Sequence, residues 1–81
     1  TDEFIKYSRS GTMKIIDAKS LGQAIREQRR RLKVTQKDLA MTSGTGLRFI
    51  IDLEKGKTTC QLGKALEIAR ALGLNLEIFE P

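Results

Sequence analysis

The chain has 81 residues, of which 15 are lysine or arginine and 10 are aspartate or glutamate, so its formal net charge is +5. It holds one cysteine and no histidine, which excludes an intrachain disulfide and leaves too few ligands for a zinc site. No apolar run approaches the ~18 residues of a membrane span and no signal peptide is visible from Thr1, so we expect a cytoplasmic protein without metal or cofactor.

Residues 1–16 are predicted to form an N-terminal arm. Phe4, Ile5 and Tyr7 follow no clean period, and Gly11 interrupts the segment. Residues 13–16, with the sequence MKII, are compatible with a short strand. We expect the first eleven residues to order only against another surface.

The first helix is predicted over residues 18–32. Asp17 can cap its amino end, because a carboxylate accepts hydrogen bonds from the free amides of the first turn. Ile16 and Leu21 then occupy the two positions of a hydrophobic staple. Gln28 interrupts an apolar stripe at helical spacing that comprises Leu21, Ala24, Ile25 and Leu32.

A second, shorter helix is predicted over residues 36–42. Thr35 and Asp38 have the spacing of a capping box, and Val34 with Leu39 repeats the staple. Gly44 ends this helix, since glycine adopts a positive φ without steric cost. Only about two turns remain, which is too short for a helix to be stable alone in water.

The third helix is predicted over residues 46–55. At 100° per residue, Gly46, Ile50 and Leu53 point to the core, with Phe49 on one flank. Gly56 closes the helix. The opposite face is unusual because it mixes an apolar side chain with charged ones; it comprises Arg48, Ile51, Asp52 and Lys55, with Leu47 at its edge.

Thr59 is expected to cap the fourth helix, over residues 60–72, and Gly73 to stop it. Its apolar face consists of Leu62, Ala65, Leu66, Ala69 and Leu72. Residues 74–80 then alternate as a strand does, and a lone strand needs a partner. A small domain gains stability from oligomerisation, so we predict that residues 74–81 pair across a homodimer through Leu74, Leu76, Ile78 and Phe79.

Two short capped helices joined by a glycine-containing turn predict a helix-turn-helix within residues 17–73. The net positive charge favours a nucleic-acid partner. Arg48 could then bond a guanine edge, and Leu47 and Ile51 could pack on thymine methyl groups. The alternative is that Leu47 and Ile51 are core or dimer residues and that Arg48 pairs with Asp52.

The sequence "TQKDLA…SG…GLRFIIDLEKGK…QLGKALEIARALGL" resembles the repressor/Cro-like (XRE-type) helix-turn-helix family over residues 21–79. Within that family it is most similar to HipB-type antitoxins. The resemblance implies a mainly α, repressor-like domain of four to five helices with a short C-terminal strand pairing across a dimer. It also implies a palindromic operator and a partner, a HipA-type serine/threonine kinase toxin.

The resemblance also implies roles for single residues. Leu47, Arg48 and Asp52 would face the bases, together with Ile51, which helical periodicity places on the same face. Gln36 and Lys57 would contact the DNA backbone, and we predict the same role for Thr45 and Lys55. Arg29 and Glu54 would form a buried ion pair. Gly46 and Leu47 replace the polar pair common at the start of the third helix, which implies a readout unlike that of phage repressors.

The predicted function is therefore that of a nucleoid-associated, dimeric repressor and antitoxin, and not of an enzyme. Cys60 has no histidine to activate it as a nucleophile. Two alternatives stay open: a stand-alone repressor without a toxin, and an adaptor that binds only proteins. RNA binding is disfavoured, because one Tyr, three Phe and no Trp make a thin stacking platform.

Overall fold

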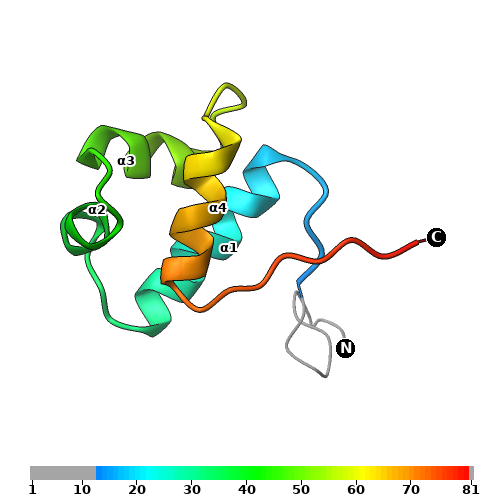
Figure 1. Cartoon of the computed structure of the whole chain (residues 1–81), viewed down its shortest axis with the longest axis horizontal. Coiled ribbons are helices and arrows are strands. Elements are labelled where there is room, and N and C mark those ends of the chain that lie inside the picture. The colour runs from blue at the N-terminus through cyan, green and yellow to red at the C-terminus, as the bar shows by residue number, and fades with distance from the viewer. Residues whose placement is uncertain (1–12, 81) are drawn as a thin grey trace.

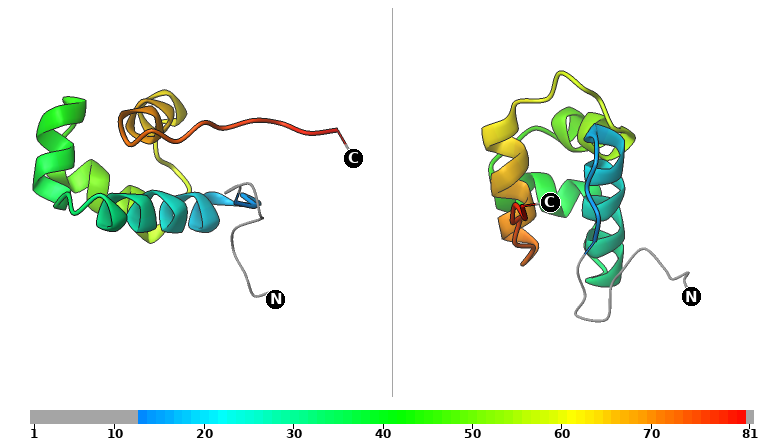
Figure 2. Two further views of the ribbon diagram at one scale, coloured as in Figure 1. Left: turned by 90° about the horizontal axis from the view of Figure 1, so that it is seen from below. Right: turned by 90° about the vertical axis from the view of Figure 1, so that its right-hand side faces the viewer.

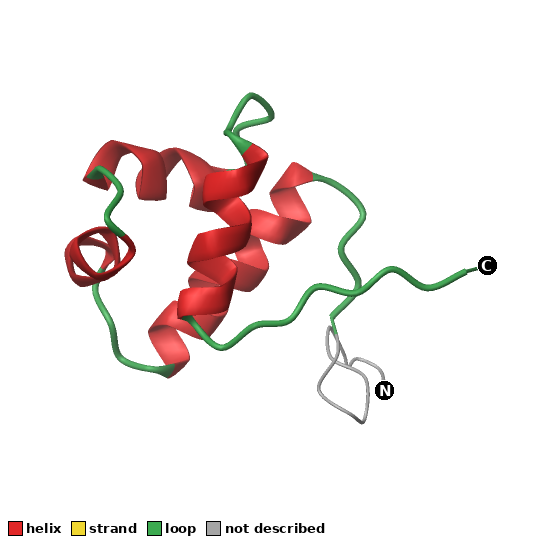
Figure 3. Ribbon diagram, viewed as in Figure 1, coloured by secondary structure: helices red, strands yellow, loops and turns green. Residues whose placement is uncertain are grey.

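The structure, a computed structural model, describes residues 13–80. Four helices form this part of the chain: α1 (Ala18–Arg31), α2 (Gln36–Ser43), α3 (Leu47–Lys55) and α4 (Leu62–Ala71) (Figure 1). No strand is present among the described residues, and Met13 makes only an isolated β-bridge (Figure 3). The predicted mainly α fold is confirmed.

The amino ends of α1 and α2 are fixed by side chains. Asp17 Oδ1 accepts from the Ser20 amide at 2.7 Å, and Ser20 Oγ accepts from the Asp17 amide at 3.0 Å. These bonds to Ser20, the backbone one foremost, hold the pKa of Asp17 below its usual 3.8. Thr35 and Asp38 form the predicted reciprocal box at 3.0 and 3.4 Å.

The predicted start of the fourth helix is wrong. Residues 58–60 form a bend and turn that carry the chain across from α3, so α4 begins at Leu62 rather than at residue 60. Thr59 lies in that turn and does not cap the helix. Gln61 stands at the cap position and makes no side-chain capping bond.

All four helices end in the same way. A residue one or two positions past each helix end has a positive φ, and the amide that follows it donates back to the carbonyl five residues earlier, as in a Schellman motif. Gly44, Gly56 and Gly73 fill this position in α2, α3 and α4, as predicted. In α1 the position is held by Lys33, with φ 60°, which was not predicted from the sequence.

The core is built from one face of each helix. Its buried apolar residues are Ala24, Ile25, Leu39, Ala40, Ile50, Leu53, Ala65, Ile68, Ala69 and Leu72. Helices α1 and α3 approach very closely at Gly22, where an added Cβ would lie 2.2 Å from the Leu53 carbonyl oxygen. Gly56 also lies tight against α1, where an added Cβ would be 2.8 Å from Lys19 Cα.

Some apolar side chains expected in contact are exposed instead. Ile16 and Leu32 lie just outside the two ends of α1, so neither the Ile16–Leu21 staple nor the end of the predicted stripe is formed. Ile68 takes the central core position of α4, since the buried row of that helix is Ala65, Ile68, Ala69 and Leu72. The exposed large apolar side chains of α4 are Leu62 and Leu66.

Residues 74–80 form an extended tail that runs away from the helices (Figure 2). Leu74 packs against the core, while Leu76, Ile78 and Phe79 are exposed. Gln28, the polar residue that interrupts the stripe of α1, donates from Nε2 to the Leu72 carbonyl at 3.0 Å and so caps the end of α4. Pairing of the tail with a second copy stays a prediction.

Candidate nucleic-acid interface

Helices α2 and α3 form the helix-turn-helix. Figure 1 shows α2 end-on while α3 lies across the view, so the two helices cross at a large angle. The turn between them is stabilised by two bonds: the Thr45 amide donates to the Ala40 carbonyl at 3.1 Å, and the Ser43 and Thr45 hydroxyls lie 3.0 Å apart. A short, internally bonded turn fixes the orientation of α3 relative to α2.

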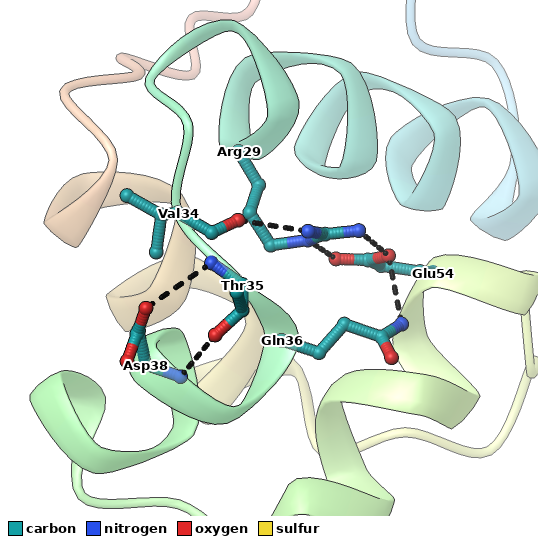
Figure 4. A network of polar contacts seen from close by, with 6 residues as sticks. All are labelled: Arg29, Val34, Thr35, Gln36, Asp38 and Glu54. Carbon is teal, nitrogen blue, oxygen red and sulfur yellow. Dashed lines mark hydrogen bonds and ion pairs between the residues drawn. The ribbon is translucent and has the colours of Figure 1, made fainter.

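Arg29 and Glu54 connect this unit to α1 (Figure 4). Arg29 Nε lies 2.6 Å from Glu54 Oε2, and the second guanidinium bond to Oε1 is 3.0 Å. The side chains are only 11% and 3% exposed. Arg29 also donates to the Val34 carbonyl at 2.8 Å, so the same guanidinium supports the start of α2.

Gln36 belongs to the same network. Its amide Nε2 donates to Glu54 Oε1 at 3.1 Å (Figure 4). Glu54 therefore accepts from α1 and α2 at once, which fixes the position of the first residue of α2 relative to α3. Gln36 was assigned to the DNA backbone from the sequence, and its bond to Glu54 was not predicted.

The outer face of α3 carries the predicted base-reading residues. Arg48 and Leu47 are exposed and Ile51 is half-buried. Arg48 Nε lies 3.3 Å from Asp52 Oδ1, so the i, i+4 pair proposed as an alternative is present in the unbound protein. The inner face holds Ile50 and Leu53, both buried.

Gly46 was predicted to point to the core, but it lies exposed at the cap position, outside α3. On the flank of the helix, Phe49 is half-buried. Lys64 of α4 places its ammonium 5.7 Å from the centre of the Phe49 ring, a cation–π distance. These contacts seat the start of α3 against α4.

The predicted backbone-contacting residues lie at the ends of the two helices. Gln36 begins α2 and is half-buried, and Thr45 is half-buried in the turn. Lys55 is exposed in the last turn of α3. Lys57 follows α3, and its Nζ lies 3.5 Å from Asp52 Oδ2. The structure thus brings the side chains of Arg48, near the start of α3, and of Lys57, just after its end, to the same carboxylate of Asp52.

Other kinds of site find little support in residues 13–80. This part of the chain brings no three potential metal ligands together. None of its helices is long and apolar enough to cross a membrane. Cys60 is a half-buried free thiol next to the start of α4.

The geometry of α2, the turn and α3 defines a helix-turn-helix protein. The family model described as Helix-turn-helix matches residues 25–79, and the chain belongs to this family. It is 43% identical over 61 residues to a Sinorhizobium fredii protein named as an HTH-type transcriptional regulator, y4mF, in a match that covers 75% of this chain and 80% of that one. A second protein named as an HTH-type transcriptional regulator, from Methanothermobacter thermautotrophicus, is 49% identical over 49 residues, in a match that covers 60% of this chain and 71% of that one.

Solved structures of HipB have a similar fold. A HipB–O4 20mer complex and a HipA–HipB–O2–O3 complex both match with a TM-score of 0.78 and 23% identity, over 85% of this chain and 97% of theirs. The family and the HipB-like fold predicted from sequence are confirmed. The protein is a DNA-binding transcriptional regulator of the helix-turn-helix type.

Proposed function

We propose that the chain is a homodimeric, sequence-specific repressor that reads a two-fold symmetric operator with the outer face of α3. One observation carries this proposal. The Arg48 side chain is 77% exposed on a helix whose opposite side is anchored by the buried Glu54. A rigidly held helix with an exposed arginine is what base readout in the major groove requires.

In this proposal the contacts divide into two sets. Arg48 donates to a guanine edge, and the exposed Leu47 with the half-buried Ile51 packs on thymine methyl groups. Asp52 completes the base-facing set. The second set holds the DNA backbone and fixes the register of α3 in the groove; it comprises Gln36, Thr45, Lys55 and Lys57.

The dimer is proposed to form through the tail. Leu76, Ile78 and Phe79 are exposed on an extended segment, and the described chain offers no strand to pair with it. Pairing with a symmetry mate would bury these side chains and satisfy the backbone amides. Two copies of α3 would then lie about one DNA turn apart, ~34 Å, which requires a two-fold operator.

A HipA-type kinase is the proposed protein partner, bound on surfaces that leave α3 free. The likeness of the fold to HipB, which one solved structure holds in complex with HipA, supports this choice. The exposed Leu62 and Leu66 give α4 an apolar outer surface that neither the core nor α3 uses. Phe4, Ile5 and Tyr7, the arm residues predicted to order on a partner, lie outside the described residues.

Three measurements test these proposals. Sedimentation at micromolar concentration is expected to show about twice the chain mass, and a persistent monomer contradicts the dimer. Selection from random-sequence duplexes is expected to enrich a palindrome.

Co-expression with a HipA-type kinase from the same genome is expected to yield a stable complex with the full chain. A chain that binds the palindrome but never the kinase is a stand-alone repressor, and one that binds only proteins is an adaptor.

A further inference from the structure

We propose that Asp52 is a positioning residue for DNA recognition, which holds Arg48 and Lys57 together and makes binding depend on sequence. This inference rests on the proposed function, since it concerns how the outer face of α3 reads DNA. A single carboxylate then couples the base contact of Arg48 to the backbone contact of Lys57.

The geometry sets Asp52 between two cations. One carboxylate oxygen lies 3.3 Å from Arg48 Nε and the other lies 3.5 Å from Lys57 Nζ. The Asp52 side chain is 17% exposed, whereas those of Arg48 and Lys57 are 77% and 55% exposed. The carboxylate is thus the sheltered member of the group, and the two exposed cations are held against it.

Asp52 also fixes the backbone at the end of α3. Its carbonyl oxygen accepts from the Lys57 amide at 3.0 Å, in the motif that ends the helix around Gly56. Lys57 is therefore held by Asp52 at both its backbone and its side chain. This places the ammonium group beside α3 rather than free in the loop that follows.

The contact to Arg48 leaves its recognition edge free. The ion pair uses Nε, so the two terminal nitrogens of the guanidinium remain to donate to O6 and N7 of a guanine. Holding one side of a long arginine side chain reduces the rotamer freedom that binding would otherwise have to remove. Asp52 therefore prepares Arg48 for a bidentate contact without occupying the atoms that make it.

The contact to Lys57 gives the same carboxylate a second effect. Away from a correct site, the negative charge offsets one of the two cations and repels phosphate, which weakens the sequence-independent part of binding. At a correct site, a phosphate oxygen replaces Asp52 as the partner of Lys57, and both carboxylate oxygens become available to Arg48. The backbone contact and the base contact are then energetically coupled through Asp52.

A plain surface ion pair would behave differently. Exposed i, i+4 pairs contribute little, and loss of one negative charge raises affinity for every duplex alike. The discriminating quantity is therefore the ratio of affinity for a preferred duplex to affinity for random DNA, rather than either affinity alone. A positioning role changes the ratio, and a charge effect does not.

The test compares Asp52→Asn with Glu67→Gln, which removes the same charge from an exposed position on α4. The probes are the duplex that the full wild-type chain enriches from a random-sequence pool and a scrambled duplex of equal length. We expect Asp52→Asn to lower the ratio roughly tenfold, because a good bidentate base contact accounts for discrimination of about that size. Glu67→Gln is expected to leave the ratio unchanged, and Asp52→Glu to recover most of it.

A double-mutant cycle on Arg48→Ala and Lys57→Ala completes the test. Their effects on the preferred duplex are expected to be non-additive with Asp52 present and additive with Asp52→Asn. An Asp52→Asn ratio equal to that of Glu67→Gln, or a cycle that is additive in both backgrounds, overturns the inference while duplex binding persists. If the wild-type chain binds no duplex at all, the proposed function fails and this inference fails with it.

Discussion

Helix α3 carries two carboxylates that lie two residues apart, and their ion-pair partners and surroundings differ sharply. Glu54 faces inward, is almost fully buried and accepts from Arg29 and Gln36. Asp52 faces outward and meets the exposed Arg48 and Lys57. The inner pair joins α3 to α1 and α2, whereas the outer pair presents charge to solvent. We therefore expect the inner pair to determine stability and the outer pair to determine recognition.

Removing Glu54 should have the largest effect on stability. Glu54→Ala strands the Arg29 charge in a site where its side chain is 11% exposed, and breaking a buried pair in this way costs ~3–5 kcal/mol. Thermal or urea unfolding measures the loss. The matched control is Glu67→Ala on the exposed face of α4, which should stay within ~0.5 kcal/mol of wild type. Equal stability of the two variants would show that the inner pair does not anchor α3.

Adding a side chain at Gly22, where α1 packs against α3, should have the next largest effect on stability. Gly22→Ala places a Cβ 2.2 Å from the Leu53 carbonyl oxygen, a backbone atom that cannot move without moving α3. We expect a loss of ~1–3 kcal/mol in urea unfolding, the usual cost of overpacking. Gly63→Ala on α4 meets nothing within 4 Å and should gain up to ~1 kcal/mol from helix propensity. If both variants gain stability, the close approach does not constrain α3.

Replacing Lys33 should have a smaller effect, of opposite sign. Lys33 lies two residues past the end of α1 with φ 60°, whereas glycine occupies the matching place after the other three helices. Lys33→Gly should stabilise the protein against thermal unfolding by ~1 kcal/mol, because a side chain in the left-handed region costs about that much. The reciprocal variant, Gly73→Lys, should lose a similar amount. A loss of stability in Lys33→Gly would show that the side chain makes a compensating contact.

The sequence predicted features that depend on neighbours along the chain. The caps at Asp17 and Thr35 and the glycine after each of the last three helices follow from local backbone chemistry. The pairing of Arg29 with Glu54 followed from the family resemblance. These two kinds of information were enough to locate the helix-turn-helix and its inner ion pair.

Features that depend on the distance between elements were not predicted. The tight fit at Gly22 exists only because α3 passes over that residue, although a glycine inside a helix was a visible signal. From the sequence, Gln28 was only an interruption of the apolar stripe of the first helix. Its hydrogen bond to the Leu72 carbonyl exists because α4 packs beside it. Periodicity placed Leu62 and Leu66 in the apolar face of the fourth helix and left out Ile68, and this was wrong, because the row of α4 that faces the core contains Ile68 and leaves both leucines exposed.

Arg48→Ala should have the smallest effect on stability, and it tests most directly whether the outer pair determines recognition rather than stability. Arg48→Ala removes an exposed, i, i+4 ion pair, and such pairs contribute at most ~1 kcal/mol, so unfolding should be nearly unchanged. The same variant should lose ~1–3 kcal/mol of discrimination between the preferred and the scrambled duplex. Lys57→Ala should weaken binding to the preferred duplex and reduce the slope of log K against log salt for that duplex by ~0.9, because Lys57 contacts a phosphate there in place of Asp52. A large loss of stability in Arg48→Ala, or an equal loss of affinity for both duplexes, would place Arg48 with the structural residues and leave the outer face of α3 without a base-reading arginine.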